Sequence, residues 1–238
     1  MFKPKSEKSA INALMTNGTM VDYPGRMSAL FFTRGCNFRC GFCHNSTLLD
    51  SGGKTYSWED LGEICDRFQK QWVHAVTISG GEPTIQPALK DTILFFKDRG
   101  FLVKLDSNGA RPEILSEVLP LIDYIAMDIK GSLKNYSRFA GYHGDLHKIE
   151  ESIKLIMEQA KDYEFRTTLI ESWHTPEEIE RCAQLVRGAK LYIFQAFLPR
   201  EDLPDPSLRT EKRTRPDYLQ KAADIASKYV KKAVVRGE

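Results

Sequence analysis

The feature that most constrains this chain is a short segment with three cysteines, Cys36, Cys40 and Cys43. The segment follows an apolar run at residues 28–33, which is typical of a buried strand. Thiolate is a soft ligand that suits iron–sulfur clusters and zinc. A [4Fe–4S] cluster with a complete protein ligand set takes four thiolates, whereas this Cys-x-x-x-Cys-x-x-Cys segment supplies three. One iron would keep an open coordination position, at which a substrate or cosubstrate could bind.

Structural zinc is the alternative for this segment, because His44 directly follows Cys43 and would complete a set of four ligands. Adjacent residues rarely reach one tetrahedral ion without strain, however, and structural zinc sites usually combine two separate ligand pairs. A disulfide framework is less favoured still, since the chain has five cysteines, an odd number and few for its length. Cys65 and Cys182 fall on apolar helix faces, and we expect both in the core.

Composition limits the class of protein. The chain of 238 residues is long enough for one large domain or two small ones, and its formal net charge is +2. This balance gives no support for nucleic-acid or membrane binding as a main function. No apolar stretch approaches the length of a membrane span, and residues 1–8 lack the apolar core of a signal peptide. Free cysteines without a secretion signal predict the reducing cytoplasm, where an oxygen-sensitive cluster would survive.

Strand and helix patterns alternate from residue 28 onward. The predicted strands are residues 28–33, 74–79, 101–105, 123–129, 165–170 and 191–196, and the predicted helices include 112–119, 146–160 and 217–231. Ser57 and Thr175 are typical N-caps of two further helices, and another helix runs from Pro87 to Gly100. The alternation predicts a parallel sheet with helices outside it. A full eight-unit barrel needs roughly 250 residues, so we expect a partial, open (β/α)6 TIM-like barrel, with a doubly wound sheet as the competing architecture.

The chain divides into three parts around that core. Residues 1–27 are an N-terminal lead-in, for which Asn17-Gly18 predicts a hairpin turn. Residues 28–197 form the partial barrel. Residues 198–238 are a C-terminal extension, rich in proline and charge until its final helix, and the whole is expected to be a single domain.

Polar motifs stand at the carboxyl ends of several predicted strands. The second strand is followed by Gly80, Gly81 and Glu82, the third by Asp106, Ser107 and Asn108, the fourth by Asp128 and Lys130, and the fifth carries Arg166. Taken singly, each motif is explained by a tight turn or a surface ion pair. Because the carboxyl ends of parallel strands meet at one edge, the motifs together predict a rim that can hold a substrate carrying both charges.

The cysteine spacing, with Phe42 just before the third cysteine, resembles the signature of the radical S-adenosylmethionine superfamily. The longer string, from Asp22-Tyr-Pro-Gly25 to the Cys-x-x-x-Cys-x-x-Cys-His-Asn45 run, is similar to the activating enzymes of glycyl-radical enzymes. Among these it is most like the activators of anaerobic ribonucleoside-triphosphate reductase. The resemblance covers residues 17–197 and implies a [4Fe–4S] cluster on Cys36, Cys40 and Cys43, with S-adenosylmethionine as cosubstrate.

The resemblance also implies roles for the strand-end residues. Glu82, in the Gly80-Gly81-Glu82 motif, would bind the amino group of the methionine moiety by a charge-assisted hydrogen bond. Lys130 and Asp128 would contact the methionine end as well, whereas Asp106, Ser107 and Asp128 would line a monovalent-cation site. Further contacts to the cosubstrate are expected from Phe42, His44 and Asn108. Arg166 could pair with its carboxylate, and Gln195 could hydrogen-bond its adenosyl group.

By this resemblance the chain is a radical enzyme of the activating type. One electron from the cluster would cleave S-adenosylmethionine to methionine and a 5′-deoxyadenosyl radical, which abstracts a hydrogen from a glycine of a partner enzyme. Anaerobic ribonucleotide reductase is the expected partner, because Gln195-Ala-Phe197 stands where pyruvate formate-lyase activators have a histidine-containing motif. A flavodoxin- or ferredoxin-type protein is the expected electron donor. No acid–base pair is needed for this chemistry.

Three alternatives remain open at this stage, and the first is an activating enzyme of a different glycyl-radical enzyme. A radical enzyme acting on a small molecule would use the same cysteine segment, and an electron-transfer or zinc protein would be no enzyme at all. The clustered strand-end motifs disfavour the non-enzymatic alternative. Asp22-Tyr-Pro-Gly25 matches an Asp-Gly-Pro-Gly motif of activating enzymes, but a plain turn explains these residues equally well.

Overall fold

A nine-stranded sheet forms the centre of the computed structural model, which describes residues 3–237. Seven of its strands run parallel and are β3 (Arg26–Thr33), β4 (Ala75–Gly80), β5 (Leu102–Ser107), β6 (Tyr124–Asp128), β7 (Tyr163–Leu169), β8 (Tyr192–Ala196) and β9 (Ala233–Arg236). Each of these strands pairs with its predecessor in the chain. A doubly wound sheet reverses its strand order partway, so this sequential order identifies the predicted partial barrel.

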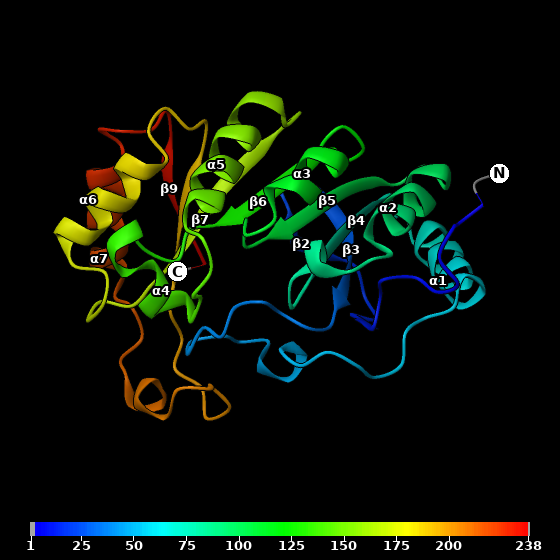
Figure 1. Ribbon diagram of the computed structural model, residues 1–238, viewed down its shortest axis with the longest axis horizontal. Helices are drawn as coiled ribbons and strands as arrows, with labels where there is room; N and C mark the ends of the chain where they lie inside the picture. Colours follow the sequence, from blue (N-terminus) through cyan, green and yellow to red (C-terminus); the bar gives the residue numbers. More distant parts are fainter. Residues whose placement is uncertain (1–2, 238) are drawn as a thin grey trace.

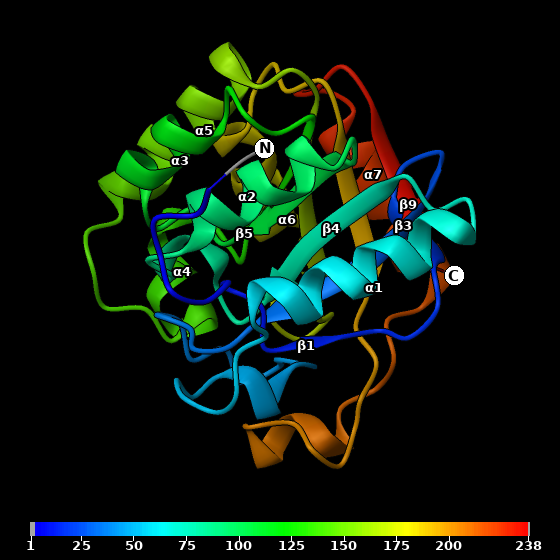
Figure 2. The same cartoon turned by 90° about the vertical axis from the view of Figure 1, so that its right-hand side faces the viewer.

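The helices connect the parallel strands and lie along the outside of the curved sheet (Figure 1 and Figure 2). They are α1 (Trp58–Lys70), α2 (Leu89–Asp98), α3 (Pro112–Val118), α4 (Leu133–Ala140), α5 (His147–Gln159), α6 (Pro176–Leu185) and α7 (Pro216–Ala226), with short 3₁₀ turns η1 (Ser46–Leu48), η2 (Pro83–Ile85) and η3 (Pro206–Thr210). The predicted caps are confirmed, because Ser57 Oγ accepts from Asp60 N at 3.1 Å and Thr175 Oγ1 from Glu178 N at 3.3 Å.

Two elements were not predicted. Helix α4 lies in a stretch that the sequence left irregular, and it ends at Gly141, whose φ of 56° is the left-handed conformation that terminates helices. Strand β9 adds a seventh parallel strand from the C-terminal extension and pairs with β8. It is only four residues long and carries Arg236, so its pattern is too short to stand out.

The N-terminal lead-in adds two antiparallel strands to β3, namely β1 (Ala13–Leu14) and β2 (Thr19–Tyr23). The predicted hairpin turn at Asn17-Gly18 is wrong, because these residues join two strands that both pair with β3. The hairpin turn is Pro24-Gly25, between β2 and β3, where Gly25 has a φ of 69°. The two turn signals lie seven residues apart, and the hairpin forms at the one that is followed directly by the long strand β3.

The two faces of the barrel sheet differ in chemistry, since side chains alternate along each strand. On the outer face, Phe31 of β3 packs against Phe68 of α1 and Phe96 of α2, with ring centroids 6.1 and 4.9 Å apart. The inner face carries polar and charged side chains instead, among them Lys104, Asp106, Asp128, Glu164 and Arg166. The fold therefore places its charges inside the barrel and its apolar core between sheet and helices. No helix among residues 3–237 is long and apolar enough to span a membrane.

Candidate active site

A cavity of about 260 Å³ opens at the carboxyl ends of the parallel strands. It brings together every residue that the sequence singled out: Cys36, Phe42, Cys40, Cys43, His44, Gly80, Gly81, Glu82, Asp106, Ser107, Asn108, Asp128, Lys130, Arg166 and Gln195. Their roles stay predictions, whereas their convergence on one cavity is observed. Asn45, the last residue of the motif that carries the resemblance, also lines it. Phe38, Leu49, Ser79 and Thr168 line it as well, and the sequence analysis assigned them no role.

The cysteine segment is fastened to the barrel by backbone hydrogen bonds. Gly35 N donates to Leu48 O at 2.8 Å, and Glu82 N donates to Gly35 O at 2.8 Å. Gly80, the last residue of β4, and Gly81 permit this approach. A Cβ on Gly81 would lie 2.1 Å from Gly35 O, and Gly80 combines a φ of 123° with 2.3 Å to Thr33 O. These glycines therefore serve the contact between β4 and the cysteine segment, in addition to any contact with a ligand.

The three thiols line the cavity without pairing to one another or to a charged partner. Burial raises the pKa of Cys36 to about 11 and that of Cys40 to about 12, while Cys40 Sγ donates to Ala140 O at 3.4 Å. Iron binds the thiolate, so ligation here would release protons and replace buried S–H groups by metal bonds. A soft donor set of three thiols in one cavity fits the predicted [4Fe–4S] cluster.

His44 is turned away from the thiols. Its Nε2 lies 2.9 Å from the carbonyl oxygen of Leu198, and its ring stacks on Phe197 with centroids 6.2 Å apart. Within residues 3–237, no group of three or more Cys, His, Asp or Glu side chains is arranged around a single metal ion. The observed position of His44 thus argues against the zinc alternative, in which this imidazole would complete the ligand set.

Glu82 is completely buried and links β4 to the end of β5. Its Oε1 accepts from Thr84 N at 3.0 Å, Thr84 Oγ1 at 2.6 Å and Ser107 Oγ at 2.9 Å, and its Oε2 accepts from Asn108 N at 2.7 Å. Because an ionised carboxylate has about four acceptor sites, Oε1 is saturated and Oε2 keeps capacity on the cavity side. Burial raises the pKa of Glu82, and these donors oppose that effect.

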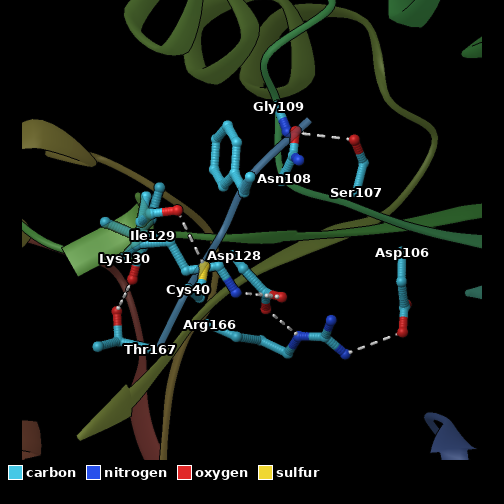
Figure 3. Close-up of polar contacts among 12 residues, drawn as sticks. Cys40, Asp106, Ser107, Asn108, Gly109, Asp128, Ile129, Lys130, Arg166 and Thr167 are labelled. Carbon is cyan, nitrogen blue, oxygen red and sulfur yellow. Dashed lines mark hydrogen bonds and ion pairs between the residues drawn. The ribbon is translucent and has the colours of Figure 1, made fainter. Parts of the chain in front are cut away.

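Charged side chains form a connected group beside the thiols (Figure 3). Arg166 joins two carboxylates, with Nε 2.9 Å from Asp128 Oδ1 and Nη1 3.3 Å from Asp106 Oδ2. Lys130 Nζ lies 3.1 Å from Asp128 Oδ2, and Lys104 Nζ contacts Asp106 Oδ1. The neighbouring Arg166 and Lys130 hold the pKa of Asp128 well below its usual range, despite its burial.

Lys104 is the charged residue of this group that sequence reasoning missed. Its side chain is fully buried, and burial lowers its pKa. A lysine inside the apolar run Phe101-Leu-Val-Lys-Leu105 was the available signal, because a lysine on a buried strand needs a partner on the same face. Asp106, two residues later, is that partner.

His174 fixes the backbone of the site at Lys130 by a hydrogen bond. Ile170 N donates to its Nδ1 at 3.1 Å, so the Nε2–H is left to donate to Lys130 O at 3.2 Å. Burial lowers the pKa of His174, which keeps the imidazole neutral. The carbonyl group of Lys130 is thereby fixed at the point where β6 leaves the barrel.

Residues 198–215 form an arm that lies against the cysteine segment. Asp205 N donates to Gly41 O at 3.1 Å, and a Cβ on Gly41 would lie 2.7 Å from Asp205 Cβ. Figure 1 and Figure 2 both show the arm and the cysteine segment side by side beyond the edge of the sheet. Part of the C-terminal extension therefore packs against the cysteine segment.

The Asp22-Tyr-Pro-Gly25 segment lies at the opposite end of the barrel. It forms the turn before β3, at the amino ends of the parallel strands, and Tyr23 packs on Tyr124 with ring centroids 5.8 Å apart. Tyr23, Ala75 and Tyr124 form a small apolar cluster there. No residue of this segment lines the cavity, and the segment forms a turn, as the plain-turn alternative expects.

Comparison with known proteins agrees with this geometry. The model of the radical SAM superfamily matches residues 30–187. A protein of Methanocaldococcus jannaschii, provisionally named as a glycyl-radical enzyme activating enzyme, is 32% identical over 239 residues, covering 96% of either chain. The 7-carboxy-7-deazaguanine synthase of Thermococcus kodakarensis is 26% identical, covering 75% of this chain and 76% of the synthase.

A solved structure supports the fold alone. Streptococcus suis SuiB, crystallised with S-adenosylmethionine, superposes with a TM-score of 0.64 at 14% sequence identity, covering 85% of this chain and 48% of SuiB. The chain belongs to the radical SAM superfamily, and it is accordingly an enzyme that uses a [4Fe–4S] cluster and S-adenosylmethionine. Within that superfamily, its relative of matching length groups it with the glycyl-radical enzyme activating enzymes.

Proposed function

We propose that this enzyme installs a glycyl radical on anaerobic ribonucleoside-triphosphate reductase. The observation that carries the proposal is the single cavity shared by all the predicted site residues, in a chain that matches an activating enzyme over its whole length. When bound, the cluster supplies the electron that cleaves S-adenosylmethionine into methionine and a 5′-deoxyadenosyl radical. The chain itself binds, orients and shields the cosubstrate.

Each side of the cavity has a proposed task. Cys36, Cys40 and Cys43 hold three irons of the cluster. The free acceptor site on Glu82 Oε2 receives the amino group of the methionine moiety, and Lys130 receives its carboxylate. Lys130 is held for this by Asp128 and lies 5.7 Å from the centre of the Phe42 ring, so its ammonium stays charged while buried.

The remaining contacts concern the adenosyl moiety and the substrate glycine. Gln195 and Asn108 line the same cavity and offer amide groups to the adenosyl group. Glycine suits as substrate because it has no Cβ to obstruct the approach of the 5′ carbon, and flanking amides stabilise its α-radical. A flavodoxin- or ferredoxin-type donor would deliver the electron. His44 lines the cavity as well, with its ring held between the Leu198 carbonyl group and Phe197, and its proposed contact is with the cosubstrate.

A second candidate function is radical chemistry on a small molecule. It is favoured by the likeness to a 7-carboxy-7-deazaguanine synthase over three quarters of the chain. The two candidates share the cosubstrate and the cluster, so they differ only in what receives the radical.

The first experiment tests the shared chemistry. The protein, reconstituted with iron and sulfide under anoxic conditions and reduced with dithionite, should produce 5′-deoxyadenosine from S-adenosylmethionine. Cys36→Ala, Cys40→Ala and Cys43→Ala should each abolish this product, whereas Cys65→Ala, in the core between α1 and the sheet, should keep it. Retention of cleavage in all three variants would remove the cluster from this segment.

The second experiment separates the two candidates. Addition of the anaerobic reductase should give a glycine-centred doublet in electron paramagnetic resonance, and a Gly→Ala change at the radical position of the reductase should abolish it. A doublet with another glycyl-radical enzyme would change the partner but keep the class. The absence of a doublet with every such enzyme, despite active cleavage, would favour the small-molecule function.

A further inference from the structure

We infer that the guanidinium of Arg166 takes the place of an inorganic monovalent cation at the Asp106–Asp128 pair, so that S-adenosylmethionine binds here without such an ion. The inference rests on the proposed function for the identity of the ligand. It concerns the residues that the family resemblance assigns to a monovalent-cation site, namely Asp106, Ser107 and Asp128. The arrangement of these residues does not fit that ion.

The carboxylate oxygens are already engaged. Asp128 Oδ1 accepts from Arg166 Nε at 2.9 Å, and Asp128 Oδ2 accepts from Lys130 Nζ at 3.1 Å. Asp106 Oδ2 lies 3.3 Å from Arg166 Nη1, and Asp106 Oδ1 accepts from Lys104. Each of these four oxygens keeps a second lone pair, but a sodium or potassium ion bound there would lie beside the cationic nitrogen that the oxygen already contacts.

The third predicted ligand is also turned away. Ser107 Oγ donates to Glu82 Oε1 at 2.9 Å and accepts from Gly109 N at 3.1 Å. Its hydroxyl therefore belongs to the network that joins β4 to β5 and does not point to the two aspartates. An ion between Asp106 and Asp128 would lack this ligand.

The charge balance leads to the same conclusion. The carboxylates of Asp106 and Asp128 are matched by Arg166 and Lys130, whose pKa values their acidic neighbours raise. The two aspartates are thus neutralised by these two cations, and Lys104 adds a further positive charge. An added cation would make the group more positive and would face the guanidinium and the ammonium at close range in a medium of low polarity. Displacement of Arg166 would leave its guanidinium buried without a partner, which is costly.

Arg166 is also placed to contact the cosubstrate. Its side chain is 13% exposed and lines the cavity, and two of its five N–H groups are committed to the aspartates. The remaining N–H groups can reach the carboxylate of the methionine moiety as a fork. Arg166, held by its two ion pairs, would then bind the carboxylate of the cosubstrate in place of a metal ion.

The experiment measures binding of S-adenosylmethionine to the reconstituted protein by isothermal titration calorimetry, under anoxic conditions and at constant ionic strength. Potassium, sodium and tetramethylammonium chloride are compared, because tetramethylammonium is too large to enter the Asp106–Asp128 pair. We expect the dissociation constant of the wild-type protein to change by less than about twofold, a difference below half a kcal/mol. A wild-type affinity that falls about tenfold in tetramethylammonium would overturn the inference.

Variants of Arg166 provide the complementary result. Arg166→Ala should weaken binding at least about tenfold in tetramethylammonium, as expected for a lost charge-assisted hydrogen bond, and potassium or guanidinium ions should restore part of it. Arg166→Lys keeps the charge but cannot join both aspartates, and should lie between wild type and Arg166→Ala. Arg111→Ala, which removes an arginine outside the cavity, is the control and should bind as wild type does.

A direct measurement of ion binding distinguishes this inference from the proposed function. Thallium(I) NMR of the protein without cosubstrate should show no saturable site in the wild-type protein and one new site in Arg166→Ala. A saturable wild-type site that Asp128→Asn removes would contradict the inference, whatever the cosubstrate proves to be. Failure of S-adenosylmethionine to bind any form would contradict the proposed function instead.

Discussion

The two ends of the barrel interior carry similar charged side chains and use them differently. At the amino-terminal end, Glu164 accepts from Arg236 Nη1 and Nη2 at 2.7 Å each and from the Tyr124 hydroxyl at 3.0 Å. Tyr23 packs beside them on the Tyr124 ring. At the carboxyl end, Asp106, Asp128, Lys130 and Arg166 are also paired, but all four line the cavity.

The two ends differ in how many hydrogen-bond donors their ion pairs leave unused. The Arg236–Glu164 pair is bidentate and adds a hydroxyl, and Glu164 has no exposed surface. It fastens the last strand, β9, to β7 past the intervening strand β8. At the other end, each cation keeps N–H groups that no carboxylate uses, and these face the cavity. We call the amino-terminal end, with Tyr124, Glu164 and Arg236, the closed end, and its pairs stabilise the barrel. The carboxyl end, with the four cavity-lining charges, is the open end, and its charged groups remain available to a ligand.

The largest effect should come from removing the ion pair between Glu164 and Arg236 at the closed end. Glu164→Gln leaves the Arg236 guanidinium largely buried without a carboxylate, and we expect the free energy of unfolding to fall by about 2–4 kcal/mol, discounted for the partial exposure of Arg236. Urea denaturation of the protein measures this loss. The affinity for S-adenosylmethionine should stay within about twofold, since the residue lies outside the cavity.

The control for this change is Glu158→Gln, which removes an exposed carboxylate from α5 and should leave stability within about 0.5 kcal/mol. If Glu164→Gln weakened cosubstrate binding as strongly as Arg166→Ala while sparing stability, the two ends would share one task. The comparison between them would then be wrong.

The next largest effect is expected at the open end, where Gly81 lets β4 approach the cysteine segment. Gly81→Ala would place a Cβ 2.1 Å from Gly35 O and 2.9 Å from Leu48 O, so the cysteine segment must move. We expect a loss of about 1–3 kcal/mol in stability, as for other overpacked sites, and a sharp fall in iron bound after reconstitution. Iron and sulfide analysis of the purified protein, with its absorbance spectrum, checks the second result.

Gly100→Ala separates the cost of a left-handed backbone conformation from the cost of a steric contact. Gly100, at the end of α2, has a φ of 79° and nothing within 4 Å of an added Cβ. Gly100→Ala should therefore cost about 1–2 kcal/mol through its left-handed conformation alone and leave iron content unchanged. Full iron content in Gly81→Ala would mean that the close approach of β4 does not position the thiols.

The sequence predicted the open end better than the closed one, for a physical reason. Residues such as Glu82 and Asp128 follow strands in short local motifs, and the rule for parallel strands places such motifs together. The Arg236–Glu164 pair joins residues 72 apart, and β9 is too short to be recognised by its pattern. No local signal indicates that two such residues will meet past an intervening strand.

The roles of single residues were harder to predict than their location. His44 lies in the cavity lining, as expected, yet its imidazole is held by the Leu198 carbonyl group. That contact spans 154 residues and depends on an arm without periodicity. Tyr23 stands in a segment that matches a motif of activating enzymes, and its packing on Tyr124 became visible only when the register of β2 on β3 was known.

The smallest effect concerns pH and the support beneath the open end. His174 is buried, and its pKa in the folded protein lies below the ordinary 6.5. Below pH 6.5 the unfolded chain therefore binds more protons than the folded one, and the stabilising effect of the neutral imidazole, complete above that pH, is lost as the pH falls. His174→Gln keeps a donor for Lys130 O but does not titrate, so the slope of unfolding free energy between about pH 7 and 5.5 should become flatter.

Urea denaturation across this pH range measures the slope, with His147→Gln as control because His147 is exposed and pairs only with Glu150 on the surface of α5. The control should keep the slope of the wild-type protein. One proton contributes at most about 1.4 kcal/mol for each pH unit below 6.5, so down to pH 5.5 the effect stays below the loss of the Glu164 pair. An equal slope in His174→Gln and wild type would mean that the imidazole is reached by water, and that the Lys130 carbonyl group is not held by a neutral, buried donor.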